Sequence, residues 1–451
     1  MSRHFDTIAA LATPVGTAAI AVVRISGSDT FKIATALCGQ VPAARVATHI
    51  DYRDDAGQLI DDVLLTFFKG PQSYTGEDSL EVSSHGNPFI AQRILEDLLA
   101  RGCRPAEPGE FTQRAFLNGR MDLSQAEAVM DLIHARSERA LAAANAQLRG
   151  SLGRKMEELI AALLSALARI EAYIDFPDED LPPEDQKLVR EQCQHISLSI
   201  NNLIATSRYG EMLRDGVKTV IVGAPNAGKS SLLNALVGRD RALVSAEPGT
   251  TRDFIEERII VGPHSLRLID TAGLNPSPAP LEKMGMAKTL ERAAEADLFL
   301  VVLDSSLREP PALPADLLAR LTAGTTLVVL NKTDLSPALP PLPQLVGLPT
   351  IKVSALSGAG IEELRLAIAA KADAFAGSTA DGIAINARHA HALAQARTGV
   401  AEALAKLTAG GPAELVASDL RAVLAAFGEI TGRIDNERML DQLFASFCIG
   451  K

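Results

Sequence analysis

The segment Gly223-Ala-Pro-Asn-Ala-Gly-Lys-Ser230 has the residue types and the spacing of a loop that binds phosphate groups. It follows the apolar run 217–222 and precedes the stretch 231–238, which has the composition of a helix. Glycines allow backbone N–H groups to turn towards phosphate oxygens, and the N-terminus of the following helix adds a positive dipole. Lys229 would reach the β- and γ-phosphates of a nucleotide, and the Ser230 hydroxyl would bind Mg²⁺. The alternative is a glycine-rich turn without a ligand.

Three further motifs follow predicted strands and extend the site to a guanine nucleotide. In Asp270-Thr271-Ala272-Gly273 the carboxylate suits the Mg²⁺ shell and the glycine N–H suits the γ-phosphate. In Asn331-Lys332-Thr333-Asp334 the last carboxylate can accept hydrogen bonds from N1–H and the N2 amino group of guanine, and adenine offers neither donor. Ser354-Ala355-Leu356 would support the base through a backbone N–H.

The residues expected to act in hydrolysis lie between these motifs. Thr251, in the segment Gly249–Asp253, should complete the coordination of Mg²⁺ as a switch threonine. Leu274 stands where Ras-type GTPases place the glutamine that orients the attacking water, and leucine cannot do this. Hydrolysis must therefore recruit another polar group, or the protein is a slow switch. Glu282 is a candidate for that group, and the alternative is an ordinary solvated glutamate at the start of a helix.

The elements that must position these motifs predict a multidomain protein with α/β and all-α parts. Residues 216–375 alternate strands and helices, which predicts an α/β domain with a mostly parallel sheet. Residues 1–118 are rich in short β-branched runs with one helix at 88–100, and residues 119–215 have the spacing of long amphipathic helices. Helical patterns return in residues 376–451. Helices on both sides of the α/β domain favour a bundle split by an insertion over two separate helical domains.

Composition excludes several classes of protein. The 451 residues hold 44 Lys and Arg against 55 Asp and Glu, and the net charge of −11 excludes a chain that is basic throughout and coats nucleic acid. Aromatic residues make up only 4%, which disfavours a surface that binds nucleic acid mainly by stacking. The four cysteines lie far apart, no apolar run is long enough for a membrane span, and the N-terminus lacks the pattern of a secretory signal. We therefore expect a reduced, cytoplasmic protein without a membrane span.

Beyond the nucleotide motifs, the chain resembles the MnmE (TrmE) family of tRNA-modification GTPases over essentially its whole length. The resemblance rests on Tyr74-Thr-Gly-Glu-Asp78, Glu81 with His85-Gly86, Pro108-Gly-Glu-Phe111, Arg114-Ala-Phe-Leu-Asn118, Asp122-Leu-Ser-Gln-Ala-Glu127 and Phe447-Cys-Ile-Gly-Lys451. It implies an N-terminal domain (1–118) that binds folate and dimerises, a helical domain in two parts (119–215 and 376–451), and an inserted Ras-like P-loop GTPase domain (216–375).

The resemblance also implies an activity. The family forms a homodimer and works with an FAD-containing flavoprotein, MnmG (GidA), in a heterotetramer or larger complex. Together they add a carboxymethylaminomethyl group to C5 of the wobble uridine, position 34, of certain tRNAs. The one-carbon unit comes from a formyl- or methylene-tetrahydrofolate derivative, and GTP hydrolysis depends on K⁺ and Mg²⁺.

Site residues follow from the motifs and the resemblance together. Catalytic roles fall to Glu282 as the residue that orients water, Thr251 and Lys229, and Mg²⁺ is assigned to Ser230 and Thr251. K⁺ is assigned to Asn226, Ser245, Glu247 and Thr250, and folate to Arg24, Glu81, Arg120 and Lys451. Relatives typically have uncharged residues where Glu247 and Pro248 stand, and some have lysine at position 120. The GTP contacts are Asn226, Ala227, Gly228, Lys229, Ser230, Ser231, Ser245, Ala246, Glu247, Pro248, Gly249, Thr250, Thr251, Asp270, Thr271, Ala272, Gly273, Asn331, Lys332, Asp334, Ser354, Ala355 and Leu356.

Several alternatives stay open at the level of sequence. The chain would be a ribosome-assembly or signalling GTPase without modification chemistry, or a folate-binding interaction protein with a vestigial GTPase domain. Cys448 is either a nucleophile or a reduced structural cysteine. The locally basic stretch 114–155, which includes Arg114 and Arg139, is either a tRNA contact or a solvated helix face.

Overall fold

The computed structural model of this chain forms two compact units. It describes residues 6–175, 183–238, 256–270, 295–309, 313–335, 339–340, 342–375, 383–432, 443–444, 447 and 450. One unit comprises Met1–Met130 with Gly428–Lys451, and the other comprises Asp131–Phe427. The predicted segment limits at 118, 215 and 375 do not coincide with the limits of these units, and they stay predictions.

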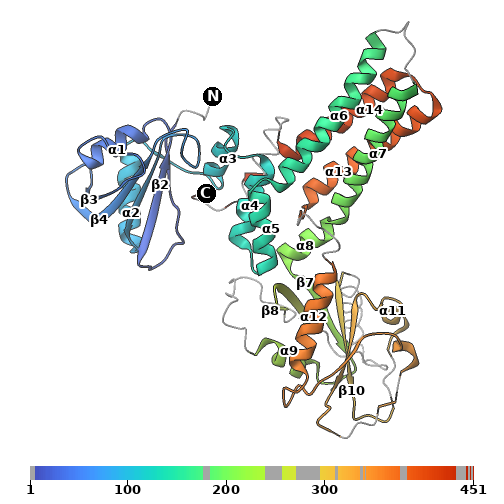
Figure 1. Ribbon diagram of the computed structural model, residues 1–451. Helices are drawn as coiled ribbons and strands as arrows, with labels where there is room; N and C mark the ends of the chain where they lie inside the picture. Colours follow the sequence, from blue (N-terminus) through green and yellow to red (C-terminus); the bar gives the residue numbers. More distant parts are fainter. Residues whose placement is uncertain are drawn as a thin grey trace, which may run out of the picture. The chain divides into compact units, whose positions relative to one another are not determined.

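The first unit is built on a six-stranded sheet with the order β3-β4-β5-β2-β1-β6. Neighbouring strands are antiparallel except β1 and β6, which are parallel. Helices α1 and α2 pack on one face of the sheet (Figure 1). The prediction of a β-rich N-terminal part with a helix at 88–100 is confirmed. The elements are β1 (Ile8–Leu11), β2 (Ile20–Ser26), α1 (Thr30–Cys38), β3 (Ala47–Arg53), β4 (Leu59–Phe68), β5 (Ser79–His85), α2 (Pro88–Ala100) and β6 (Arg104–Pro105).

Alternation along β2 and β5 separates an apolar face from a polar one. Val23 and Ile25 of β2 join the core beneath α1 and α2, together with Leu80 of β5. Because successive side chains on a strand point to opposite faces, Arg24 and Glu81 lie on the other face of the sheet. These two residues are also direct partners in the β2–β5 register. The first unit therefore presents a charged pair on the face that the two helices leave open.

Residues near the C-terminus complete the first unit. Helix α3 (Glu110–Leu117) leads into α4 (Leu123–His134). Leu123 and Ala126 of α4 form a small apolar cluster with Phe444 and Phe447. Gly109, just before α3, has a φ of 68°, and a Cβ there would lie 2.6 Å from the carbonyl oxygen of Phe444. Only glycine therefore permits this close approach of the two segments.

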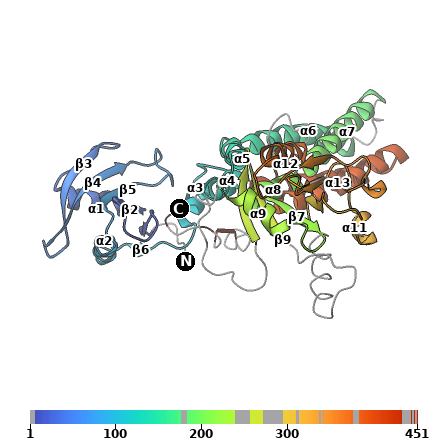
Figure 2. The same ribbon diagram turned by 90° about the horizontal axis from the view of Figure 1, so that it is seen from below.

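The second unit combines a helical bundle with an α/β domain. Helix α13, which follows the α/β domain in sequence, packs along α7, which precedes it, and α6 packs on α7 as well (Figures 1 and 2). This arrangement confirms the predicted bundle interrupted by an insertion. The helices are α5 (Glu138–Leu148), α6 (Ser151–Asp175), α7 (Pro183–Ala205), α8 (Ser207–Asp215), α13 (Ala387–Ala409) and α14 (Ala413–Thr431).

The α/β domain, here called the G domain, has a sheet with the order β12-β11-β10-β7-β9-β8. Every neighbouring pair is parallel except the β8–β9 hairpin, which confirms the prediction of a mostly parallel sheet. Strand β8 is not among the strands that the sequence predicts. The elements are β7 (Val217–Gly223), α9 (Lys229–Val237), β8 (Glu256–Val261), β9 (His264–Asp270), β10 (Leu298–Asp304), α11 (Ala315–Leu318), β11 (Thr326–Asn331), a 3₁₀-helix (Pro343–Leu345), β12 (Thr350–Lys352) and α12 (Ile361–Phe375).

Both faces of the G-domain sheet are buried, which explains why its strands are continuous apolar runs. Strand β10 shows the pattern, since its even-numbered residues Leu298, Leu300 and Val302 pack towards α9 and α12. The odd-numbered residues of β10 pack towards α11 and the 3₁₀-helix instead. Among the residues described, no helix has both the length and the apolar character that a membrane span requires.

Candidate functional site

The parallel strands of the G domain bring the predicted motifs to one edge of its sheet. Strand β7 ends at Gly223, β9 at Asp270 and β11 at Asn331, and all three run in the same direction. Loops that follow parallel strands meet at the carboxyl edge of a sheet, which is where α/β proteins bind ligands. Three motifs far apart in sequence therefore converge.

The loop between β7 and α9 has the backbone that phosphate binding requires. Asn226 has a φ of 62° and Gly228 a φ of 91°, so the loop passes through the left-handed region twice. A Cβ on Gly228 would lie 2.2 Å from Nδ2 of Asn331, so any larger residue would collide with the neighbouring motif. Ser230 and Ser231, in the first turn of α9, are exposed at this edge. The glycine is thus needed both for its φ and for the close packing.

Lys229 is folded back over this loop. Its side chain is buried, and Nζ donates hydrogen bonds to the carbonyl oxygens of Gly223 at 3.2 Å and Ala224 at 3.0 Å. The ammonium group is therefore held at the mouth of the loop, next to the N-terminus of α9. A cation at that place complements an anionic ligand.

Asn331 ties two of the motifs together. Its Nδ2 donates to the carbonyl oxygen of Ala227 at 3.0 Å, and its Oδ1 accepts the backbone N–H of Ala355 at 3.0 Å. The side chain is almost fully buried, so both ends of the amide are satisfied within the protein. One side chain thereby sets the position of the phosphate loop relative to the loop that contains Ser354, Ala355 and Leu356.

Asp334 and Ser354 lie in contact at the same edge. The Ser354 hydroxyl donates to Oδ1 of Asp334 at 2.6 Å, which orients the carboxylate. Asp334 itself is exposed to solvent, and Leu356 is 89% exposed. An oriented, exposed carboxylate beside a backbone loop can accept hydrogen bonds from a planar base with two adjacent donors.

Lys332 has a partner that the sequence did not reveal. It adopts a φ of 63°, and its Nζ lies 2.6 Å from Oδ2 of Asp304 at the end of β10. Burial would raise the pKa of Asp304, but hydrogen bonds from Lys332 and Ser306 outweigh it and hold the pKa below its usual range. Such a carboxylate stabilises the fold at neutral pH, and that stabilisation is lost as the pH falls through the lowered pKa. The sequence feature that could have indicated this partner is the acidic residue Asp304, which directly follows the apolar run 298–303.

Several predicted site residues lie outside the described residues. They are Ser245, Ala246, Glu247, Pro248, Gly249, Thr250, Thr251, Thr271, Ala272, Gly273, Glu282, Cys448 and Lys451. Of Asp270 the structure describes the backbone as the last residue of β9.

A second candidate site surrounds Arg24 in the first unit. Its Nε and Nη2 donate to Oε1 of Glu81 at 3.1 and 2.8 Å, and its Nη1 donates to the carbonyl oxygen of Gly450 at 3.3 Å. The guanidinium carbon also lies 5.5 Å from the ring centre of Tyr74 and 5.9 Å from that of Phe111. Arg24 is thus fixed between a carboxylate, two aromatic rings and the backbone of Gly450. Arg120, the third predicted folate contact that is described, is exposed.

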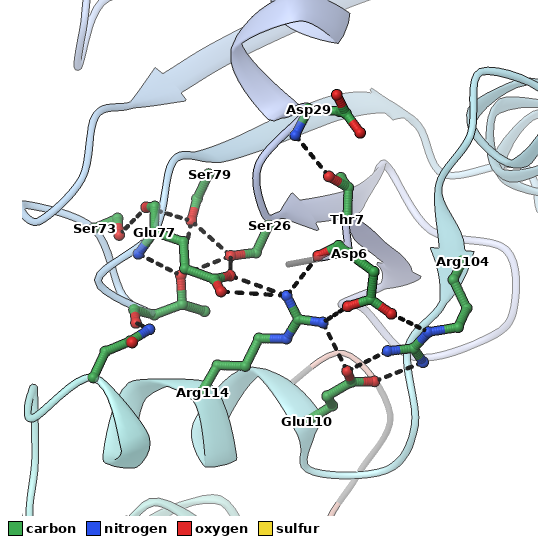
Figure 3. A network of polar contacts seen from close by, with 12 residues as sticks. Asp6, Thr7, Ser26, Asp29, Ser73, Glu77, Ser79, Arg104, Glu110 and Arg114 are labelled. Atoms are coloured by element: carbon green, nitrogen blue, oxygen red, sulfur yellow. Dashed lines mark hydrogen bonds and ion pairs between the residues drawn. The ribbon is translucent and has the colours of Figure 1, made fainter. Parts of the chain in front are cut away.

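A partly buried network of ion pairs lies in the same unit (Figure 3). Arg114 is 4% exposed and donates to Asp6, to Glu77 and, at 2.9 Å, to Glu110. Arg104 shares both Asp6 and Glu110. Burial would raise the pKa of Glu110, but hydrogen bonds from Arg104, from the backbone N–H of Glu107 and from Arg114 together outweigh it and lower the pKa. The network fastens α3 to the sheet.

The buried position of Arg114 corrects one hypothesis about the basic stretch. A side chain that is 4% exposed and held by three carboxyl-bearing residues cannot contact tRNA. Arg139, from the same stretch, is paired with Asp373 at 2.7 Å. The stretch 114–155 is therefore not one continuous basic surface, because part of its charge is neutralised inside the protein.

The described cysteines are poor candidates for nucleophiles. Burial raises the pKa of Cys103 to about 12 and that of Cys193 to about 11, and it raises the pKa of Cys38 as well. A thiol with a raised pKa holds little of the reactive thiolate at neutral pH.

Comparisons with known proteins agree over the full length of the chain. A family model described as the MnmE helical domain matches residues 123–448, and one described as the GTP-binding protein TrmE N-terminus matches residues 7–120. Curated proteins called tRNA modification GTPase MnmE are similar to it. That of Opitutus terrae is 60% identical over 450 residues, covering 99% of each chain. Those of Symbiobacterium thermophilum and Akkermansia muciniphila are each 44% identical, again covering 99% of both chains.

The geometry around Asp334 generates the first prediction. Asp334→Asn should weaken binding of GTP by about tenfold to 100-fold, because unmatched hydrogen-bonding groups cost ~1–3 kcal/mol. It should improve binding of xanthosine triphosphate, whose ring offers an acceptor at C2 in place of the amino group. Titration calorimetry with both nucleotides measures the change. Asp316→Asn, at an exposed site on α11, is the control and should leave both affinities unchanged. Retained selectivity for GTP in Asp334→Asn would show that the base lies elsewhere.

Proposed function

This chain belongs to the MnmE family of tRNA modification GTPases, and from that premise we propose that it is a K⁺-dependent GTPase that modifies wobble uridines together with a flavoprotein partner. The partner is a protein of the MnmG (GidA) type, bound in a heterotetramer or larger complex in the cytoplasm. The product is a carboxymethylaminomethyl group on C5 of the uridine at position 34 of certain tRNAs. The chain itself acts as a homodimer.

One observation carries the nucleotide part of the proposal. Asn331 bridges the phosphate loop at Ala227 and the base-supporting loop at Ala355, each at 3.0 Å. The bridge connects the phosphate loop to the loop of Ser354, whose hydroxyl orients the exposed carboxylate of Asp334. One nucleotide would then lie with its phosphates at α9 and its base at Asp334.

Hydrolysis is assigned to residues of the chain itself. With GTP bound, Lys229 would leave the carbonyl oxygens of Gly223 and Ala224 and pair with the β- and γ-phosphates. Glu282 would orient the attacking water, since Leu274 follows the Asp-x-x-Gly motif and has no polar group. Thr251 would close over the γ-phosphate.

The oxygen atoms of the side chains at this edge are suitable ligands for Mg²⁺ and K⁺. The hydroxyl of Ser230 is exposed at the N-terminus of α9 and would hold Mg²⁺ together with Thr251. Asn226 is an exposed residue of the phosphate loop. The oxygen of its side-chain amide is a suitable ligand for K⁺, which Ser245, Glu247 and Thr250 would also bind. K⁺ supplies positive charge near the phosphates, as an arginine finger does in other GTPases.

The folate part of the proposal concerns the first unit. Support comes from Arg24, which is paired with Glu81 and lies beside Tyr74 and Phe111. A formyl- or methylene-tetrahydrofolate derivative would place its pteridine ring beside the Arg24–Glu81 pair and contact Arg120 and Lys451. The described residues suit that ligand, because the guanidinium group of Arg24 offers donors, the carboxylate of Glu81 offers acceptors, and Tyr74 is only partly buried.

The competing hypotheses lose support at this point. A ribosome-assembly or signalling GTPase without modification chemistry does not agree with family membership over the whole chain. A folate-binding protein with a vestigial G domain does not agree with a phosphate loop whose glycine, lysine and asparagine bridge are all in place.

The K⁺ assignment predicts a cation-dependent rate. GTP hydrolysis by the unaltered protein should rise sharply when Na⁺ is exchanged for K⁺, measured as phosphate release at saturating GTP. Asn226→Gly should lose most of this rise, and glycine tolerates the φ of 62°, so the variant isolates the loss of the amide. Asn234→Ala, at an exposed position of α9, is the control and should respond to K⁺ normally. Equal rates in Na⁺ and K⁺ would refute the assignment.

The folate assignment predicts a loss of affinity in the first unit. Arg24→Ala should weaken binding of formyltetrahydrofolate at least about tenfold, or ~1.4 kcal/mol, because it removes the cation that pairs with Glu81. Glu81→Gln tests the same pair without deleting a large side chain and should also weaken binding. Arg53→Ala, on the exposed edge strand β3, is the control. Unchanged binding in both test variants, measured by equilibrium titration, would place the folate elsewhere.

The modification itself is tested in cells that lack this gene. Mass spectrometry of digested tRNA should show loss of the carboxymethylaminomethyl group from wobble uridines. Complementation with the unaltered gene should restore it, whereas complementation with Lys229→Ala should not, since that variant removes the cation at the phosphates. Unchanged wobble uridines in the deletion strain would contradict the proposed tRNA modification. They would not contradict the assignment of GTPase activity, which the nucleotide experiments test separately.

A further inference from the structure

The β8–β9 turn, defined here as residues 261–264, lies at the amino edge of the G-domain sheet. Strand β9 begins at this turn with His264 and ends at Asp270 on the nucleotide edge. Strand β8 starts shortly after Thr251 and runs back to the turn. The hairpin therefore spans the sheet from the two segments expected to sense the γ-phosphate to the opposite edge.

Helices α5 and α12 hold the β8–β9 turn directly. The backbone N–H of Arg139, at the start of α5, donates to the carbonyl oxygen of Pro263 at 3.1 Å. The Arg139 guanidinium donates to Oδ1 of Asp373 on α12 at 2.7 Å. The same oxygen lies 3.0 Å from Nε2 of His264, which is 3% exposed. One carboxylate oxygen thus joins an arginine of the bundle to a buried residue of the turn.

Further contacts attach the hairpin to helix α12. Arg365 of α12 donates to the carbonyl oxygen of Ile260 at 2.9 Å and to that of Leu236 at the end of α9 at 3.2 Å. A Cβ on Gly262 would lie 3.4 Å from the Cβ of Ala369 on α12. The hairpin and α12 consequently form one packed body, to which α5 is attached through Arg139.

We propose that Arg139 and Asp373 form a clamp through which the nucleotide state of the G domain reaches helix α5. The inference rests on the proposed function, since it requires GTP and GDP to place the segments beside β8 and β9 differently. A hydrogen-bonded hairpin moves as a unit, so a displacement at Asp270 also displaces the turn at His264. Arg139 is a positioning residue in this scheme, because it contacts neither the nucleotide nor the phosphate loop.

The three partners of the clamp come from three different elements, and this favours a role in coupling over that of a local ion pair that only stabilises the fold. Arg139 belongs to the bundle, Asp373 to the last helix of the G domain, and His264 to the hairpin. Burial lowers the pKa of His264 even though the Asp373 carboxylate acts in the opposite direction. The neutral ring therefore adds no second positive charge next to Arg139 at neutral pH, and the carboxylate keeps its pairing with the arginine.

Hydrogen–deuterium exchange on the full-length protein tests the clamp. The protein is compared with GDP and with a non-hydrolysable GTP analogue, in the presence of Mg²⁺ and K⁺. In the unaltered protein, peptides from the phosphate loop and from α5 (Glu138–Leu148) should both exchange differently in the two states. In Arg139→Ala and in Asp373→Asn the difference in α5 should become much smaller while that in the phosphate loop persists, because only the backbone hydrogen bond from residue 139 to Pro263 still joins α5 to the turn. Arg139→Lys, which keeps the charge, should retain part of the α5 difference.

The control is Arg421→Ala, which removes an exposed ion pair with Glu171 at 2.8 Å within the bundle. It should leave the α5 difference unchanged. An α5 difference that is undiminished in both Arg139→Ala and Asp373→Asn would overturn the clamp, as would an α5 without any difference in the unaltered protein. A phosphate loop without any difference in the unaltered protein would overturn the nucleotide assignment and the clamp together.

Discussion

Parallel pairing of β7 with β9 and β10 is the constraint on which the rest of the second unit depends. It requires both faces of the sheet to be covered, because crossover connections place helices on each side. It also brings the carboxyl ends of strands from distant parts of the chain to one edge. The phosphate loop, the Asn331 bridge and the Asp334 carboxylate are close in space only because these strands run in the same direction.

Most of the fold could be predicted from sequence, and so could the strands whose ends carry the motifs of the G-domain site. Loop glycines, a lysine and a serine at fixed spacing are a local pattern, and continuous apolar runs mark buried parallel strands, so β7, β10 and β11 were evident. Strand β8 was not, because Glu256–Val261 mixes charged and apolar residues at the edge of the sheet. The bridge from Asn331 to Ala227 could not be predicted either, since the two residues are 104 positions apart and no local period connects them.

The distribution of charge on the surface could not be predicted from the sequence. A count of basic side chains in 114–155 treats each of them as solvated, yet Arg114 lies inside a network with Asp6, Glu77 and Glu110. Burial of an arginine is tolerated when several carboxylates satisfy its donors, and such sets form between segments that are not neighbours in sequence. The net charge of −11 is not altered by such ion pairs, because each engages one acidic and one basic group, but it does not tell where either sign lies on the surface.

The two edges of the G-domain sheet consequently do different things. The carboxyl edge holds the exposed polar residues Asn226, Ser230 and Asp334, which a ligand can reach. The amino edge holds groups that are already paired within the protein, namely Pro263, His264 and Asp373 with Arg139. A ligand changes the first set by binding, whereas the second set can only respond to movement of the strands between them. The β8–β9 hairpin extends from one edge to the other. In the proposed scheme it is therefore the element that moves the turn at the amino edge when the nucleotide at the carboxyl edge changes.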